Sequence, residues 1–73
     1  MNFLNFKLQM NIFTNQIKRD ILNYIKTNNG AHYGDIIEQL DYPANKLMRT
    51  IISLKQQRKV FKDNNGGQFK LTM

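Results

Sequence analysis

The sequence predicts a small α+β domain in which three helices are followed by a C-terminal β-hairpin, with an arm at the N-terminus. Three segments repeat their apolar residues at spacings of three and four, which is typical of amphipathic helices. Two short apolar segments near the end of the chain flank a turn rich in Asn and Gly, which is typical of a hairpin. Because the chain has 73 residues, it holds a single domain, expected at residues 13–73 after an arm at 1–12.

The N-terminal arm alternates apolar and polar residues without a break. The apolar positions are Leu4, Phe6, Leu8, Met10 and Ile12. This period of two favours a half-buried strand or extended arm. A helical period also fits, at Phe3, Phe6, Met10, Phe13 and Ile17. The extended arm is the favoured interpretation, and its apolar side chains need a cover, either from the domain or from a second copy of the chain.

The first helix is expected at about residues 14–28, with Thr14 as its N-cap. Its apolar stripe consists of Ile17, Ile21, Leu22, Tyr24 and Ile25. The stripe is followed by residues that tolerate a positive φ angle, the last of which are Asn29 and Gly30. These residues predict the end of the helix.

A shorter second helix is expected at about residues 33–41, with Ile36, Ile37 and Leu40 on its apolar face. Asp35 and Glu38 lie in its first turns, where the helix dipole favours carboxylates. The helix dipole explains the presence of these two acidic residues better than a role as a catalytic pair of carboxylates would. His32 stands three residues before Asp35, so we expect it to cap the helix rather than bind a metal.

The third helix is expected from Pro43 to Arg58, because proline is well tolerated at the first position of a helix. Leu47, Ile51 and Leu54 form its buried stripe. Strands at about 60–62 and 68–71 then form the hairpin. The three tyrosines are expected to pack in the core or in turns rather than to stack on bases.

This order of elements resembles the winged helix-turn-helix DNA-binding superfamily, over about residues 13–72. In that resemblance 35–40 belong to the second helix, 47–54 to the recognition helix, and 60–71 to the wing. Residues 42–60 align without a gap with the recognition helix of small bacterial repressors. The resemblance implies a three-helix winged helix-turn-helix fold with a C-terminal β-hairpin wing and an N-terminal arm.

The chain is also similar to Z-form nucleic-acid binding domains. The similar positions are Pro43, Arg49, 53–54 and 61–71. That branch has Asn and Tyr at the positions of Met48 and Ile52, and a proline pair before a tryptophan in its wing. Because these residues are not kept, recognition of Z-form nucleic acid is not predicted.

The charge is unevenly distributed along the chain. The net charge is +6 and the isoelectric point is about 9.9, which favours a polyanionic partner. Residues 1–30 carry a net +3, residues 31–45 a net −3, and residues 46–73 a net +6. The positive charge is therefore concentrated in the third helix and the hairpin.

The resemblance implies that the outer half of the third helix enters the major groove of DNA. The residues on that half are Asn45, Met48, Arg49, Ile52, Gln56 and Lys59. Arginine pairs with guanine, asparagine and glutamine pair with adenine, and apolar side chains contact thymine methyls. The residues expected to contact phosphates are Lys46, Lys55, Arg58, Lys59, Lys62 and Lys70. Three other cations, Lys18, Arg19 and Lys26, are expected to lie too far round the domain to help.

The resulting hypothesis is a small DNA-binding transcriptional regulator of phage or plasmid type, a homodimer joined through its N-terminal arm. The alternative is a protein-interaction module that binds a host or replication protein through Met48, Ile52 and the arm. The absence of cysteine excludes disulfides and thiolate metal sites. No signal peptide or apolar segment of membrane-spanning length is recognised, so we expect a cytoplasmic protein that is associated with the nucleoid if it binds DNA. No nucleophile–base pair or phosphate-binding glycine loop is recognised, so no enzymatic activity, cofactor or metal is expected.

Overall fold

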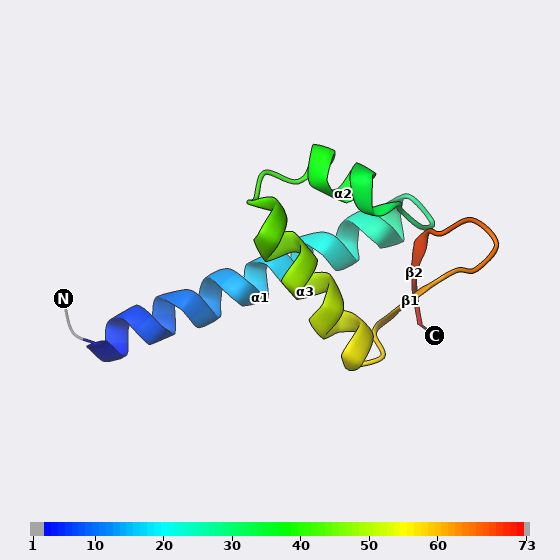
Figure 1. Cartoon of the computed structure of the whole chain (residues 1–73). Coiled ribbons are helices and arrows are strands. Elements are labelled where there is room, and N and C mark those ends of the chain that lie inside the picture. The colour runs from blue at the N-terminus through cyan, green and yellow to red at the C-terminus, as the bar shows by residue number, and fades with distance from the viewer. Residues whose placement is uncertain (1–2, 73) are drawn as a thin grey trace.

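A computed structural model describes residues 3–72 of the protein, with side chains from Thr14 onward. Residues 3–72 form three helices and two strands: α1 (Phe3–Thr27), α2 (Tyr33–Gln39), α3 (Ala44–Gln56), β1 (Val60–Lys62) and β2 (Phe69–Leu71). In Figure 1, α3 crosses α1, α2 lies beside both, and the two strands stand near the C-terminal end of α1. The predicted α+β class and the order of elements are confirmed.

The helix α1 corrects two expectations for the N-terminal region. Residues 3–12 were expected to form an extended arm or strand, but they are helical and continue into the first expected helix. No proline or glycine interrupts residues 3–27, so the helical period of the apolar residues prevails over their period of two. Thr14 is therefore inside α1 and is not its N-cap. A contact between two copies through residues 1–12 involves side chains outside the described residues.

The end of α1 agrees with the expectation that residues tolerant of positive φ would stop it. Asn29 has a φ of 55° and Gly30 a φ of 118°. The Gly30 amide donates to the Ile25 carbonyl over 2.9 Å, and the Asn29 amide donates to the Lys26 carbonyl over 3.4 Å. This pair of bonds is a Schellman motif, which satisfies carbonyl groups that the helix end would leave unpaired.

The helix α2 begins at Tyr33 as expected and ends two residues early, whereas α3 begins and ends slightly inside its expected bounds. His32 is the N-cap residue of α2, and its backbone amide donates to Asp35 Oδ2 over 3.3 Å, as the spacing of these residues predicted. Pro43 precedes α3 as its cap instead of forming its first turn.

The C-terminal end of α3 corrects the placement of Lys59. The helix ends at Gln56, and the Lys59 amide donates to the Leu54 carbonyl over 2.9 Å while Arg58 has a φ of 59°. This is a second Schellman motif, with a non-glycine residue in the left-handed conformation. Because the chain leaves the helix here, Lys59 does not lie on the outer half of α3.

The hairpin is antiparallel, and Val60 pairs with Leu71, Phe61 with Lys70, and Lys62 with Phe69. Ala31, between α1 and α2, adds an isolated bridge to Phe69. The Ala31 amide donates to the Phe69 carbonyl over 3.0 Å, and the Phe69 amide donates back over 2.8 Å. These two bonds tie β2 to the helices, so the hairpin does not depend on its own strands alone.

The hydrophobic core draws on every element. Its buried members are Ile17, Ile21, Ile25, Ala31, Ile36, Leu47, Ile51, Leu54, Val60 and Phe69. Each isoleucine in this set contributes about 1.5–3 kcal/mol by leaving water. The three tyrosines pack half-buried against this core, as expected. Within residues 3–72, no helix combines the length and apolar character needed to cross a membrane.

Candidate nucleic-acid interface

The outer face of α3 presents the side chains that sequence reasoning placed there. Those that lie exposed on the helix are Asn45, Met48, Arg49, Ile52 and Gln56. They project outward because Leu47, Ile51 and Leu54 are buried on the opposite side. The face therefore combines amide, guanidinium and apolar groups that are free to meet a partner.

Met48 and Ile52 are the most unusual members of this face. Their side chains are 48% and 47% exposed, although both are large and apolar. They line a hollow of about 270 Å³ between α3 and the hairpin, which we term the α3–hairpin hollow. The other residues around it are Tyr33, Ile51, Lys55, Lys62, Gly67 and Phe69. The fold thus brings Lys62 of the hairpin next to the apolar pair of α3.

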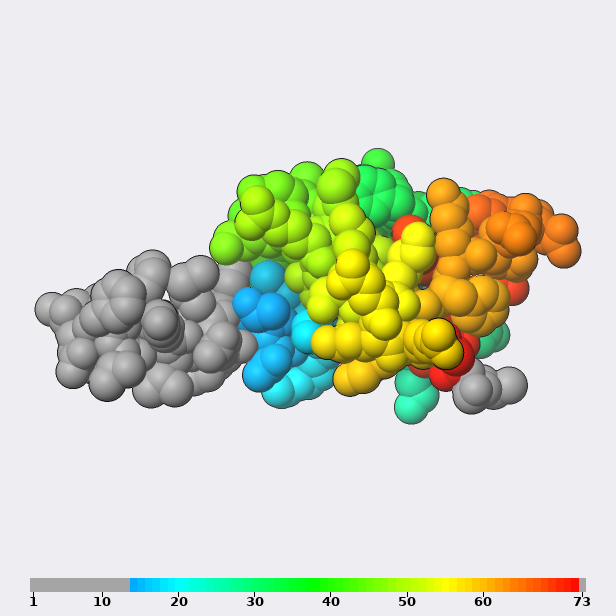
Figure 2. All heavy atoms as spheres, turned by 60° about the horizontal axis from the view of Figure 1, so that its bottom comes forward, coloured from blue at the N-terminus to red at the C-terminus, as the bar shows by residue number. Residues whose placement is uncertain are grey.

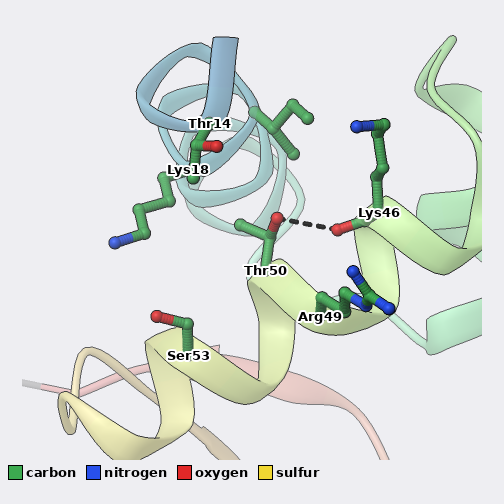
Figure 3. A pocket seen from close by; sticks show the side chains of 7 residues that line it. Thr14, Lys18, Lys46, Arg49, Thr50 and Ser53 are labelled. Carbon is green, nitrogen blue, oxygen red and sulfur yellow. Dashed lines mark hydrogen bonds between the residues drawn. The ribbon is translucent and has the colours of Figure 1, made fainter. Parts of the chain in front are cut away.

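A second hollow, of about 280 Å³, lies on the other flank of α3, where the helix meets α1 (Figure 3). It is termed the α1–α3 hollow and is lined by Thr14, Ile17, Lys18, Lys46, Arg49, Thr50 and Ser53. Lys18 was expected to lie too far round the domain, yet it shares this hollow with Lys46 and Arg49. The sequence gives no signal for this proximity, because it depends on how α1 crosses α3.

The remaining basic residues differ in how available their charges are. Lys55, Arg58, Lys59 and Lys62 are exposed. Lys70, by contrast, forms an ion pair with Asp63, with 3.1 Å between Nζ and Oδ2. The amide of Asn65 and the ammonium of Lys70 both hydrogen-bond the carboxylate of Asp63 and lower the pKa of this group. Part of the Lys70 charge is thereby neutralised within the hairpin.

Acidic residues are absent from α3 and from both strands. The acids of the middle of the chain, Asp35, Glu38 and Asp41, belong to α2 and the segment after it. Asp20 of α1 accepts a hydrogen bond from the Tyr42 hydroxyl over 2.5 Å. This bond raises the pKa of Tyr42, with further contributions from burial and from the Asp20 charge. No acidic residue of α3 itself therefore offsets the positive charge of this helix.

Figure 2 shows this face of the molecule, with α3 in green to yellow, the part of α1 that begins at residue 14 in blue and the hairpin in orange. All three elements reach the surface side by side, with α3 in the middle. A partner that lies along α3 would therefore also meet α1 on one flank and the hairpin on the other.

Among the side chains of residues 14–72, no three His, Cys, Asp or Glu come together as metal ligands would. The sequence matches no model of a known protein family, and no curated protein or solved structure is significantly similar to the chain.

Proposed function

We propose that this protein is a winged helix-turn-helix DNA-binding protein that contacts duplex DNA with α3 and with the hairpin as its wing. The observation that carries the proposal is the exposed face of α3, which presents Asn45, Arg49 and Gln56 and contains no acidic residue. A helix of this kind is suited to the major groove, where donors and acceptors of the bases are accessible.

In this proposal the side chains that contact DNA divide into two groups. Arg49 reads guanine through two hydrogen bonds, while Asn45 and Gln56 suit adenine. Met48 and Ile52 contact thymine methyls. The exposed cations contact phosphates and make the affinity depend on salt; they are Lys46, Lys55, Arg58, Lys59 and Lys62. We expect a smaller contribution from Lys70, because its charge is paired with Asp63.

The biological role that follows is a small transcriptional regulator that acts as a dimer. One recognition helix reads only a short stretch of DNA, so two copies are needed to define a site of useful length. We propose that residues 1–12, at the start of the long helix α1, provide the contact between the copies.

The test compares Arg49→Ala with Arg19→Ala in binding to the DNA upstream of the protein's own coding sequence and to a random duplex. Arg19 is exposed on α1, so its replacement removes the same charge from a different surface. We expect Arg49→Ala to lose about 1–3 kcal/mol of binding free energy and Arg19→Ala to lose much less. Equal affinity of wild-type protein and Arg49→Ala at every salt concentration would contradict the proposal.

A second candidate function is supported by the exposed apolar groups. Besides Met48 and Ile52, Phe61 of β1 is 46% exposed. Exposed apolar groups next to a hollow are typical of protein-binding surfaces. If the protein is such a module, a Met48→Ala/Ile52→Ala variant loses its protein partner, and the wild-type protein has negligible affinity for nucleic acid.

A further inference from the structure

Phe61 of β1 presents an aromatic ring on the surface of the protein. Successive side chains of a strand point to opposite faces, and because Val60 is buried in the core, the ring of Phe61 points away from the core. The ring lines an open hollow of about 630 Å³, which we term the Phe61 hollow. The other residues around this hollow are Lys55, Arg58, Val60, Lys62, Asn64 and Thr72. Most of them belong to residues 55–64, around the end of α3 and the first strand, whose colours (yellow and orange) lie side by side in Figure 2.

Three cations of the Phe61 hollow are available to a partner. Lys55, Arg58 and Lys62 are exposed, and the lining includes neither Asp nor Glu. Within residues 14–72, none of these three cations takes part in an ion pair. Asp63, which follows Lys62 in the chain, is bound to Lys70 instead. Because the cations come from α3, from β1 and from the segment between them, they are suited to several phosphates along a strand rather than to one anion.

Two of these cations connect the Phe61 hollow with the α3–hairpin hollow. Lys55 and Lys62 line both hollows, so they lie where the two hollows adjoin. A nucleic-acid strand whose phosphates are bound by both lysines therefore passes next to the ring of Phe61.

The remaining groups of the Phe61 hollow suit a nucleic-acid base better than an acidic peptide. A peptide anchors large apolar side chains in an apolar pocket. Around this hollow, however, Phe61 is exposed and the one other apolar residue of the lining, Val60, is buried. A flat ring provides a surface on which any base can stack, and the exposed amide of Asn64 offers a donor and an acceptor to the edge of a base.

We propose that Phe61 is a stacking surface for one unpaired base of a nucleic acid, and that Lys55, Arg58 and Lys62 bind the neighbouring phosphates. This inference goes beyond the proposed function, because a base inside a duplex is covered on both faces by its neighbours and must leave the stack to reach a side chain. The ligand is therefore a single strand or a base displaced from a duplex, and binding of a single strand does not require that the protein bind duplex DNA.

The experiment compares a thymidine oligonucleotide of about ten nucleotides with an abasic oligonucleotide of the same length. The abasic strand keeps every phosphate and lacks the bases, so the difference between the two affinities reports the contribution of the bases. Wild-type protein, Phe61→Leu and Phe61→Tyr are titrated at one fixed salt concentration, and binding is followed by fluorescence anisotropy. Leucine removes the ring and keeps an apolar side chain, whereas tyrosine keeps the ring. Circular dichroism verifies that both variants keep the wild-type helix content.

We expect Phe61→Leu to lower the affinity for the thymidine strand at least about five-fold, and Phe61→Tyr to stay within about two-fold of wild type. Neither substitution should change the affinity for the abasic strand. Equal affinities of wild type and Phe61→Leu for the thymidine strand would overturn the proposal. It would also be overturned if a glutamate-rich peptide bound as tightly as the thymidine strand and lost this affinity in Phe61→Leu, because the hollow would then bind acidic proteins.

A fluorescent reporter tests the stacking contact itself. The chain contains no tryptophan, so Phe61→Trp places a single indole in the hollow. A base that stacks on the indole quenches its emission. The thymidine strand should therefore quench the emission and the abasic strand should not, and equal quenching by both strands would contradict stacking.

A titration of duplex DNA in parallel separates this inference from the proposed function. When the wild-type protein binds the duplex but binds the thymidine and abasic strands alike, the stacking site is disproved while the proposed function stands. When it binds the thymidine strand through Phe61 but binds no duplex, the proposed function is wrong and the stacking site stands.

Discussion

The Nε2 atom of His32 donates a hydrogen bond to the carbonyl oxygen of Gly66 over 2.7 Å and so joins the start of α2 to the turn of the hairpin. The two residues are 34 positions apart in the sequence. The same histidine caps α2 through its backbone bond to Asp35. One residue thus links the start of α2 with the turn of the hairpin.

We predict that His32→Ala loosens the hairpin turn and lowers the free energy of unfolding by about 0.5–1.5 kcal/mol, the usual contribution of one hydrogen bond. The variant His32→Asn is a matched control, because asparagine is a good N-cap but is too short to reach Gly66. Hydrogen exchange of the Gly66 and Gly67 amides measures the effect. Both variants should speed this exchange and keep α2, because the capping bond to Asp35 is donated by the backbone amide of residue 32. Unchanged exchange in both would show that the bond to Gly66 does not hold the turn.

Arg58 adopts a left-handed backbone conformation at the end of α3, with a φ of 59°. Glycine adopts this conformation without steric cost, so Arg58→Gly should stabilise the fold by about 0.5–1 kcal/mol and raise the melting temperature by several degrees. Arg58→Ala is the control, because alanine keeps the steric cost. A melting temperature of Arg58→Gly at or below that of Arg58→Ala would contradict this assignment.

Asp63 makes the hairpin sensitive to acid. Because the Asn65 amide and the Lys70 ammonium lower the pKa of its carboxyl from 3.8, the folded state binds this proton less readily than the unfolded state. The stabilisation is therefore complete well above pH 3.8 and is lost as the pH falls through the lower pKa of the folded protein. Asp63→Asn should be less stable than wild type near neutral pH, and the difference should shrink as the solution becomes acidic. Acid titrations of both proteins, followed by circular dichroism, measure this difference, and a constant difference at all pH values would argue against it.

The substitution Asp63→Asn also tests whether Lys70 contributes to DNA binding. In Asp63→Asn the ammonium of Lys70 loses its ion-pair partner, so it becomes available to phosphate. If the hairpin contacts the DNA backbone, the salt slope of binding should steepen by up to about 0.9. A slope equal to that of the wild-type protein would place Lys70 outside the interface.

Tyr42 makes the packing of the α2–α3 connection against α1 sensitive to alkali. Its hydroxyl donates to Asp20, and this bond raises the pKa of the phenol above 10.0. The stabilisation is therefore fully present below pH 10 and is lost as the pH rises through the higher pKa of the folded protein. Tyr42→Phe should be less stable than wild type at pH 8, and the difference should disappear in strong alkali. Denaturant titrations at a series of pH values measure this, and equal stabilities at pH 8 would contradict it.

Local patterns in the sequence determined most of the elements of this protein. The spacing of Ile17, Ile21 and Ile25 placed the buried side of α1, and the run of Asn29 and Gly30 placed its end. The capping of α2 by His32 and the outward direction of Arg49 also followed from spacing alone, because each depends on neighbours within one helical turn. Residues 3–12 were ambiguous, since their apolar residues fit both a strand and a helix.

Only the tertiary structure decided which distant groups meet. The bridge between Ala31 and Phe69, the bond from His32 to Gly66, and the hollow that Lys18 and Arg49 both line each bring together segments that are far apart in the chain. The hollow depends on the angle at which α1 and α3 cross, and all three contacts result from the packing of many side chains at once. Local spacing therefore identifies which residues face outward, and packing determines which of them share a site.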